Sequence, residues 1–331
     1  MPDFVLHVRA DGTLLEGESL VRADEPAHAV SWVSIEGDPA GARAVLETWG
    51  FHSLAVEDVL RAHTRSKFER YPGHGFARVP ALDRSTDDPL DTVGIHVFLR
   101  PGTVVTIAPA GAHAIAAARE AVRAHPLRGG HCTERILHAI LDEVAEEYEE
   151  VVSTFEPRLE ALLTPDPSAH GRARSHALAA RIRLLDDLRT DGLQLRRVLA
   201  PFREMVARLA EPAGGATPES LVFFRDVLDH VQYMVEECDL VGQIVSGRIT
   251  TLEAELRDEV TRANDRLNQV MKYMAAMSTL LLPMTIVSGA FGMNFRDIPW
   301  ADHPHGFWMA TGTMLLAASA LLVVFRVRRW L

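Results

Sequence analysis

The sequence predicts an α/β domain followed by a long helical stalk and two membrane-spanning helices. Short β-rich segments alternate with helical segments up to about residue 125, and the strand signals stop from residue 133 onward. Two apolar runs, residues 274–291 and 306–327, lie close together near the C-terminal end. Each run is about long enough to cross a bilayer as a helix.

Residues 1–125 form the predicted α/β domain. The segments rich in β-branched and aromatic residues, which predict strands, are residues 4–8, 29–33, 92–99 and 103–107. Pro101 and Gly102 separate the last two of these segments and predict a hairpin turn. Residues 40–49 and 111–123 are predicted to be helices.

Residues 130–215 are predicted to form a helical hairpin. Its first helix covers residues 133–163 and ends at the prolines of residues 165–168. One face of this helix is acidic, through Asp142, Glu143, Glu146, Glu147, Glu149 and Glu150. The second helix covers residues 175–209, and residues 211–215 break the chain again.

Residues 217–273 are predicted to be a stalk helix. Thr217 supplies an N-cap and Pro218 a first helical position. Apart from Gly247, nothing interrupts the helical pattern, which continues through Lys272 into the first apolar run. A single helix of this length would extend on the order of 100 Å.

The two spans, residues 274–291 and 306–327, flank an external loop of residues 292–305, and residues 328–331 form a basic tail. Lys272 precedes the first span, and Arg326, Arg328 and Arg329 close the second. Because positively charged residues that flank membrane spans stay on the cytoplasmic side, both termini are expected to be cytoplasmic and the loop external.

Composition excludes several function classes. The formal net charge of −11 argues against a nucleic-acid partner. Cys132 and Cys238 lie far apart and predict a reducing compartment without structural disulfides. No cleaved signal peptide is expected at the N-terminus. No nucleophile motif, phosphate loop or metal-hydrolase motif is present, so the chain is not expected to be an enzyme.

One face of the first span carries amides, small hydroxyls and flexible apolar groups at helical spacing. Its members are Asn264, Asn268, Met271, Ala275, Ser278, Leu282, Thr285 and Gly289. This face carries no ionisable side chain between Lys272 and Asn294, which indicates a path for a largely hydrated cation. Met271, Met274 and Leu282 are expected to form a dewetting gate. Close packing between helices is the alternative role of such small residues. Two spans cannot enclose a water-filled path, so transport would need an oligomer.

Several motifs carry a family resemblance. Residues 268–272, 282–285 and 289–295, the last containing Gly292-Met293-Asn294, closely resemble the signature of the CorA family of magnesium channels. Residues 54–60, with Arg65, Lys67, Glu69 and Tyr71 after them, resemble its N-terminal domain. Residues 223–230 resemble the start of its stalk helix. The resemblance covers most of the chain, in order.

The resemblance implies a homopentamer with a funnel-shaped cytoplasmic domain, embedded in lipid of the cytoplasmic (inner) membrane, that moves Mg²⁺. A ring of Asn294 side chains would bind the hydrated ion at the outer mouth, with Gly292 and Met293 shaping the turn. The residues expected along the path below are Asn268, Met271, Met274, Ser278, Leu282, Thr285 and Gly289. The family also senses cytoplasmic divalent cations between protomers, which implies Asp226 and Asp83 as regulatory metal ligands.

Two alternatives stay open. Arg296 stands where many family members carry acidic residues, and His303 and His305 suit softer metals such as Zn²⁺, Co²⁺ or Ni²⁺. This loop also resembles the zinc-transporting ZntB branch, which implies a zinc transporter with or without proton coupling. The other alternative is a membrane-anchored assembly that transports nothing.

Overall fold

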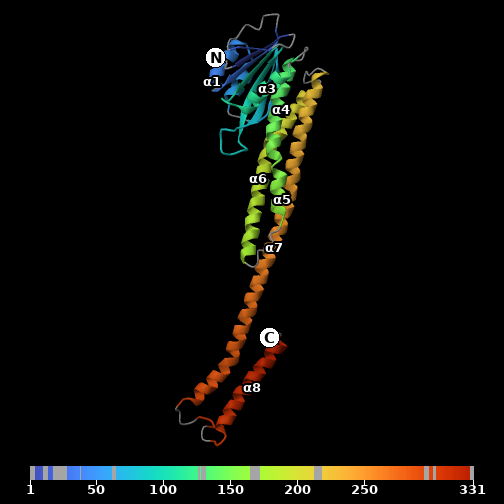
Figure 1. Ribbon diagram of the computed structural model, residues 1–331. Coiled ribbons are helices and arrows are strands. Elements are labelled where there is room, and N and C mark those ends of the chain that lie inside the picture. The colour runs from blue at the N-terminus through green and yellow to red at the C-terminus, as the bar shows by residue number, and fades with distance from the viewer. Residues whose placement is uncertain are drawn as a thin grey trace. The chain divides into compact units, whose positions relative to one another are not determined.

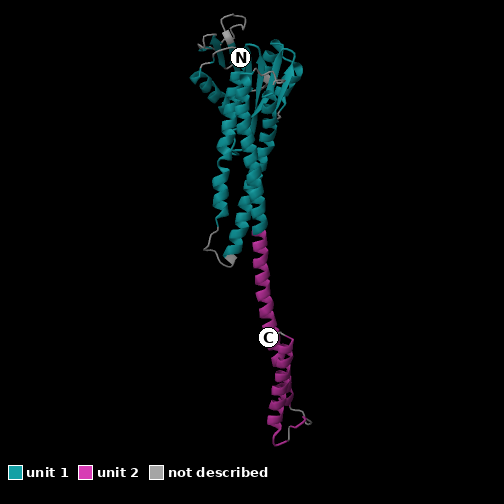
Figure 2. Cartoon of the chain, turned by 90° about the vertical axis from the view of Figure 1, so that its right-hand side faces the viewer, with its two compact units in different colours: residues 1–251 teal, residues 252–331 magenta. Residues whose placement is uncertain are grey.

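The computed structural model describes residues 4–9, 14–17, 28–37, 39–61, 65–125, 127, 132–164, 172–211, 218–293, 298–300 and 303–328. The chain divides into two compact units, Met1–Thr251 and Leu252–Leu331, which Figure 2 shows in different colours. The prediction of an α/β N-terminal domain, a long helix and two C-terminal apolar helices is confirmed.

A seven-stranded sheet in the described part of the chain forms the centre of the α/β domain (Figure 1). Its strands are β1 (Phe4–Arg9), β2 (Leu14–Gly17), β3 (His28–Glu36), β4 (Lys67–Tyr71), β5 (His74–Leu82), β6 (Thr92–Arg100) and β7 (Thr103–Ala108). The strand order is β2-β1-β3-β7-β6-β5-β4, and every neighbouring pair is antiparallel except β3 with β7. The four strands expected from the sequence are all present, whereas β2, β4 and β5 were not predicted from strand signals.

The predicted hairpin turn joins β6 to β7. Arg100 pairs with Thr103, so Pro101 and Gly102 are the two central residues of the turn. Gly102 has a φ of 73°, a conformation that favours glycine and that follows proline in a type II turn. The hairpin prediction is therefore confirmed.

Helices cover both faces of the sheet. The helices α1 (Pro39–Thr48) and α2 (Ser53–Leu60) contribute Leu46 and Val56 to a core that includes Val33 of β3. Side chains alternate along a strand, so Trp32 points to the opposite face. There Trp32 packs against Phe4, and the Arg119 guanidinium of α3 (His113–Ala124) lies 4.6 Å from the Phe4 ring centroid.

The helix α4 (Cys132–Val152) also packs against the sheet. Glu147, part of the predicted acidic face, is buried rather than solvated. Its carboxylate accepts a hydrogen bond from the Leu82 backbone N–H (3.4 Å) and lies 3.0 Å from Nδ1 of His113. These contacts join α4 to β5 and α3, so Glu147 has a structural role.

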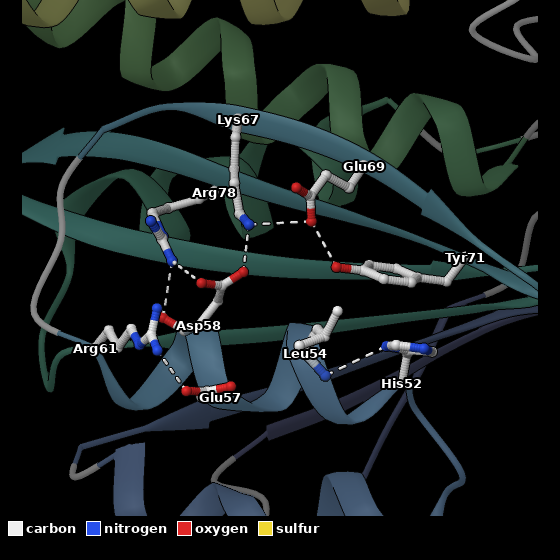
Figure 3. A network of polar contacts seen from close by, with 9 residues as sticks. All are labelled: His52, Leu54, Glu57, Asp58, Arg61, Lys67, Glu69, Tyr71 and Arg78. Carbon is white, nitrogen blue, oxygen red and sulfur yellow. Dashed lines mark hydrogen bonds and ion pairs between the residues drawn. The ribbon is translucent and has the colours of Figure 1, made fainter.

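A polar network joins α2 to the sheet (Figure 3). Asp58 of α2 forms ion pairs with Lys67 of β4 and Arg78 of β5, the latter at 3.4 Å. Lys67 also donates to Glu69 (3.0 Å), whose other partner is the Tyr71 hydroxyl (2.5 Å). The charged residues that carried part of the family resemblance therefore stabilise the packing of α2 on β4 and β5.

The helix predicted over residues 133–163 is two helices, α4 and α5 (Phe155–Leu163). The break lies at Ser153 and Thr154. Both hydroxyls donate to carbonyls three residues earlier, Ser153 to Glu150 (2.8 Å) and Thr154 to Val151 (2.7 Å). A continuous helix over residues 133–163 was therefore the wrong prediction, and the break coincides with these two hydroxyl bonds.

The helices α6 (Arg172–Leu209) and α7 (Ser220–Phe291) run side by side within the first unit (Figure 1). Their buried residues recur at alternating intervals of three and four, the pattern of packed coiled coils. In α6 these are Leu185, Leu188, Gly192, Leu195, Leu199, Phe202, Val206 and Leu209. In α7 they are Phe224, Val227, Val231, Met234, Cys238, Val241 and Val245. Pro218 lies in a turn before α7, so the prediction that it is the first helical residue was two residues early.

The second unit contains the rest of α7 and α8 (Gly306–Val327). Both are long and apolar enough to cross a membrane. The bounds of α8 coincide with the second predicted span. The first predicted span is the last part of α7, which continues through Pro283 without a break.

Candidate functional site

The residues predicted to line a path all lie on α7, in the second unit. We call this set the α7 stripe: Asn268, Met271, Met274, Ser278, Leu282, Thr285 and Gly289. Every member is exposed in the isolated chain, and Met271, Met274 and Leu282 are exposed by 58%, 66% and 59%. Three large apolar side chains with this exposure require a covering surface, either lipid or other protein.

The α7 stripe lies on the side of α7 that faces away from α8. The α7 residues with reduced exposure in this region are Ala276, Leu280, Pro283, Met284 and Val287. These recur at helical spacing on the opposite side of the helix from Ser278, Leu282 and Thr285. Ala310 and Ala318 of α8 are also buried, as expected where two helices approach closely through small residues.

Thr285 has a defined hydroxyl orientation. Its Oγ1 donates to the Leu281 carbonyl one turn earlier, at 2.9 Å. Because the single hydroxyl hydrogen is used within the helix, the remaining lone pairs of the oxygen can only accept. The Thr285 oxygen is thus suited to accept a hydrogen bond from a water molecule bound to a cation.

Gly292 and Met293 follow the end of α7. The Gly292 N–H donates to Ser288 (3.0 Å) and the Met293 N–H to Ala290 (3.4 Å), so both close the last helical turn. A Cβ atom at Gly292 would lie 3.3 Å from the Ser288 carbonyl oxygen, closer than side chains ordinarily approach. Asn294, the predicted ion ligand at the mouth, lies outside the described residues, as do Arg296, Asp297 and Asp302.

The loop before α8 brings the two predicted soft-metal ligands close together. The ring centroids of His303 and His305 are 5.9 Å apart. Nδ1 of His303 accepts a hydrogen bond from the His305 backbone N–H (3.2 Å), which favours the tautomer with its proton on Nε2. Trp300, just before them, has a φ of 64°, in the left-handed region that non-glycine residues rarely adopt.

Asp226, a predicted regulatory ligand, lies in a cluster with two residues of α4. His138, Asp142 and Asp226 each offer one ligand atom, and the three atoms lie within 4.8 Å of one another. His138 and Asp142 are four residues apart on α4 and therefore project from the same face. All three residues belong to the first unit. The cluster could hold a divalent metal ion.

The surroundings of His138 favour its neutral form. It lines a cavity of about 190 Å³ together with Asp142 and Phe223, whose ring centroid is 5.3 Å from that of the imidazole. Burial lowers the pKa of His138 below its ordinary value, and Arg135 acts in the same direction, although Asp142 and Asp226 oppose it. A neutral imidazole is the form that ligates metals.

Asp83, the other predicted regulatory ligand, belongs to a different cluster. Its Oδ1 accepts from the backbone N–H (2.9 Å) and hydroxyl (2.5 Å) of Ser85, and these bonds lower the pKa of Asp83. It lines a groove with Glu150, Arg158 and Asp191. Within one chain Asp83 and Asp226 are therefore not brought together.

The sequence prediction did not include His138 and took Asp142 only as part of an acidic face. The available signal was the spacing of a histidine and an aspartate four residues apart on a predicted helix. Their convergence with Asp226 could not be inferred, since it depends on how α4 and α7 pack across more than 80 intervening residues.

The chain resembles known proteins over nearly its whole length. A family model described as "CorA-like Mg2+ transporter protein" matches residues 27–329. The "Putative metal ion transporter YfjQ" of Bacillus subtilis is 29% identical over 329 residues, covering 98% of this chain and 97% of that protein. The "Cobalt/magnesium transport protein CorA" of Thermotoga maritima is 24% identical over 311 residues, covering 91% of this chain and 83% of that protein. The structure of the full-length CmaX protein has the same fold, with a TM-score of 0.70 and 21% identity. The match covers 100% of this chain and 98% of the CmaX chain.

Proposed function

Because this chain belongs to the family of CorA-like Mg²⁺ transporter proteins, we propose that it forms a homopentameric membrane channel for a hydrated divalent cation, Mg²⁺ in the first place. The observation that carries this proposal is the α7 stripe. It is exposed in the isolated chain, it contains amide and hydroxyl groups, and it lies away from the α8 contact. Packing several copies around these stripes would remove the polar groups from lipid and enclose an axial path.

The chemistry of the α7 stripe favours a cation that keeps its water. Mg²⁺ loses its water ligands reluctantly, and a site that stripped them would need several hard oxygen ligands such as carboxylates. The α7 stripe has none. Asn268, Ser278 and Thr285 instead offer oxygens that accept hydrogen bonds from the ion's waters. A ring of Asn294 side chains at the mouth would act in the same way.

The orientation follows from the charges that flank the two helices. Lys272 precedes the apolar part of α7, and Arg326 and Arg328 end α8. With these residues inside, both termini are cytoplasmic and the loop with Gly292, Met293 and Asn294 is external. The protein would then be a multi-pass protein of the cytoplasmic membrane.

Cytoplasmic divalent cations would regulate the channel through Asp226 and Asp83. Asp226 has two potential metal ligands beside it in the same chain, whereas Asp83 is partly buried and lies in a separate acidic groove. An ion shared with a neighbouring protomer at either position would neutralise facing carboxylates and hold the assembly closed. Loss of the ion would let the carboxylates repel and favour opening.

A zinc transporter, with or without proton coupling, is the second candidate. The observation that favours it is the close approach of His303 and His305 in the external loop. Imidazole nitrogens suit Zn²⁺, Co²⁺ and Ni²⁺ and contribute little to Mg²⁺ binding. On this alternative the loop would collect a softer metal before transport.

Cation uptake into vesicles tests the proposal. The full-length protein is reconstituted, and entry of Mg²⁺ and of Zn²⁺ is followed with trapped fluorescent indicators at two external pH values. We expect Mg²⁺ entry that does not depend on a proton gradient. We also expect Asn294→Ala to reduce it to the level of protein-free vesicles, because the hydrated ion loses its ligands at the mouth.

Gln232→Ala is the matched control. It removes an exposed amide from the same helix, where the amide hydrogen-bonds to Glu236 (2.9 Å). Full Mg²⁺ entry through the Asn294→Ala protein would contradict the proposal. Faster Zn²⁺ than Mg²⁺ entry that rises with external acidity would establish the second candidate instead.

A further inference from the structure

We propose that His138, Asp142 and Asp226 bind a borderline first-row metal ion, Zn²⁺, Co²⁺ or Ni²⁺, within a single chain and in preference to Mg²⁺. The binding itself is independent of the transport proposal. Its consequence, that the cytoplasmic domain responds to transition metals, rests on the proposed function.

The positions of the three side chains suit one small ion. Their ligand atoms lie within 4.8 Å of one another. Two ligands of a tetrahedral Zn²⁺ ion are about 3.3 to 3.6 Å apart, since each bond is about 2.0 to 2.2 Å long. Small rotations of the two aspartate side chains would therefore complete the coordination, and Asp226 is exposed enough to make them.

The imidazole of His138 supplies an unused ligand atom. Its Nε2 is buried and has no hydrogen-bond partner among the described residues. Buried polar atoms are rarely left without a partner, so this nitrogen requires an explanation. The Phe223 ring packs against the imidazole at 5.3 Å, which restricts the ring while the cavity beside it provides room for an ion. Coordination would satisfy the nitrogen.

The two carboxylates supply the charge that a divalent ion needs. Across the described parts of the chain, neither Asp142 nor Asp226 forms an ion pair with lysine or arginine. The nearby cation, Arg135, lies instead over the Phe223 ring, 5.7 Å from its centroid. Two unpaired carboxylates repel each other when close, and a bound divalent ion would reverse that interaction.

The ligand types select the metal. Mg²⁺ prefers an octahedral shell of oxygens and retains most of its waters, so an imidazole nitrogen contributes little to its binding. The same nitrogen strengthens the binding of Co²⁺, Ni²⁺ and Zn²⁺, which have a higher affinity for imidazole than the harder ions have. His138 therefore converts a pair of carboxylates of low selectivity into a site for transition metals.

Titration of the detergent-solubilised full-length protein with Co²⁺, followed by visible absorption, tests this inference. The protein carries His303→Ala and His305→Ala, so that the external loop offers no imidazole to Co²⁺. We expect one strong Co²⁺ site per chain that a large excess of Mg²⁺ does not displace. His138→Ala, and the closer mimic His138→Gln, should weaken that site at least about tenfold, the loss seen even for residues that only support a ligand. His138→Asp should create an oxygen-only set in which Mg²⁺ competes with Co²⁺.

The control is His176→Ala, which removes an exposed histidine from α6. Thermal unfolding of each variant checks that it is folded. Co²⁺ binding that is unchanged in both His138→Ala and His138→Gln, or displacement of Co²⁺ by an equal concentration of Mg²⁺, would overturn the inference. Neither outcome depends on ion flux, so failure of the site and failure of the channel proposal are separable.

Discussion

Buried charged residues in the α/β domain show how single side chains stabilise it. Arg78 is 4% exposed, and its guanidinium donates to the Asp58 carbonyl (2.9 Å) and faces the Asp58 carboxylate. Burial alone would raise the pKa of Asp58, but Lys67, Arg78 and Arg61 together lower it. Asp58 therefore remains ionised, which is the condition for keeping Arg78 buried.

His96, next to this network, should make the domain sensitive to acid. Burial, reinforced by Arg78, lowers the pKa of His96 from 6.5 to about 4. The unfolded chain thus binds a proton below pH 6.5 that the folded domain takes up only near pH 4, so the free energy of unfolding falls over this window. Protonation of His96 lowers the free energy of unfolding by at most about 3 kcal/mol over this window.

His96→Met is expected to remove part of this loss. The measurement is the midpoint of thermal unfolding of the full-length protein between pH 7 and pH 4, compared with the unsubstituted chain. The midpoint of His96→Met should fall less between pH 7 and pH 4 than that of the unsubstituted chain, because only the unsubstituted chain must keep a neutral imidazole buried. Parallel pH profiles would show that His96 is not responsible.

At the scale of helices, Gly192 lies where three elements of the first unit meet. It occupies a buried heptad position of α6 between α5 and α7. A Cβ atom there would lie 3.7 Å from the Phe155 ring and 3.9 Å from the Cys238 carbonyl oxygen. These are ordinary contact distances, so the site has room for a methyl group and for little more.

Substitutions at Gly192 should consequently act in opposite directions. Gly192→Ala should stabilise by up to about 1 kcal/mol, the difference in helix propensity. Gly192→Leu should destabilise by about 1 to 3 kcal/mol through overpacking against Phe155 and Cys238. Urea unfolding followed by circular dichroism measures both. Gly247→Leu is the control, since nothing lies within 4 Å of a Cβ there, and a loss as large as that of Gly192→Leu would refute this account.

Periodicity predicted the elements whose apolar pattern is uninterrupted and missed those in which polar residues or proline interrupt it. The bounds of α8 were predicted to the residue, and β1, β3, β6 and β7 within a few residues. The strand β5 was missed because Arg78 and Pro80 interrupt its apolar pattern. Pro80 is tolerated because β4 pairs only with His74–Arg78, so beyond Arg78 one edge of β5 has no β4 partner to which it must donate.

At the scale of the whole molecule, the candidate sites differ in how far sequence could predict them. The α7 stripe depends on spacing along one helix, so its members could be named in advance, although their role in transport stays a prediction. The cluster of His138, Asp142 and Asp226 depends on the packing of α4 against α7, and only Asp226 was predicted. The spacing of residues along one helix does not predict which distant segments of the chain will contact each other.

The central claim is that the α7 stripe lines a water-filled path, and cysteine modification tests it most directly. Thr285 of α7 is exposed and Thr311 of α8 is partly exposed, and each donates to the carbonyl four residues earlier, at 2.9 Å. The native Cys132 and Cys238 are buried, so background reaction should be small.

Thr285→Cys and Thr311→Cys proteins are each reconstituted and treated with a cationic, membrane-impermeant thiol reagent while Mg²⁺ entry is measured. A water-filled path along the α7 stripe predicts that treatment abolishes entry through the Thr285→Cys protein, because the attached positive charge repels the cation, and leaves the Thr311→Cys protein unchanged. Unchanged entry through treated Thr285→Cys, with block of Thr311→Cys, would contradict the claim.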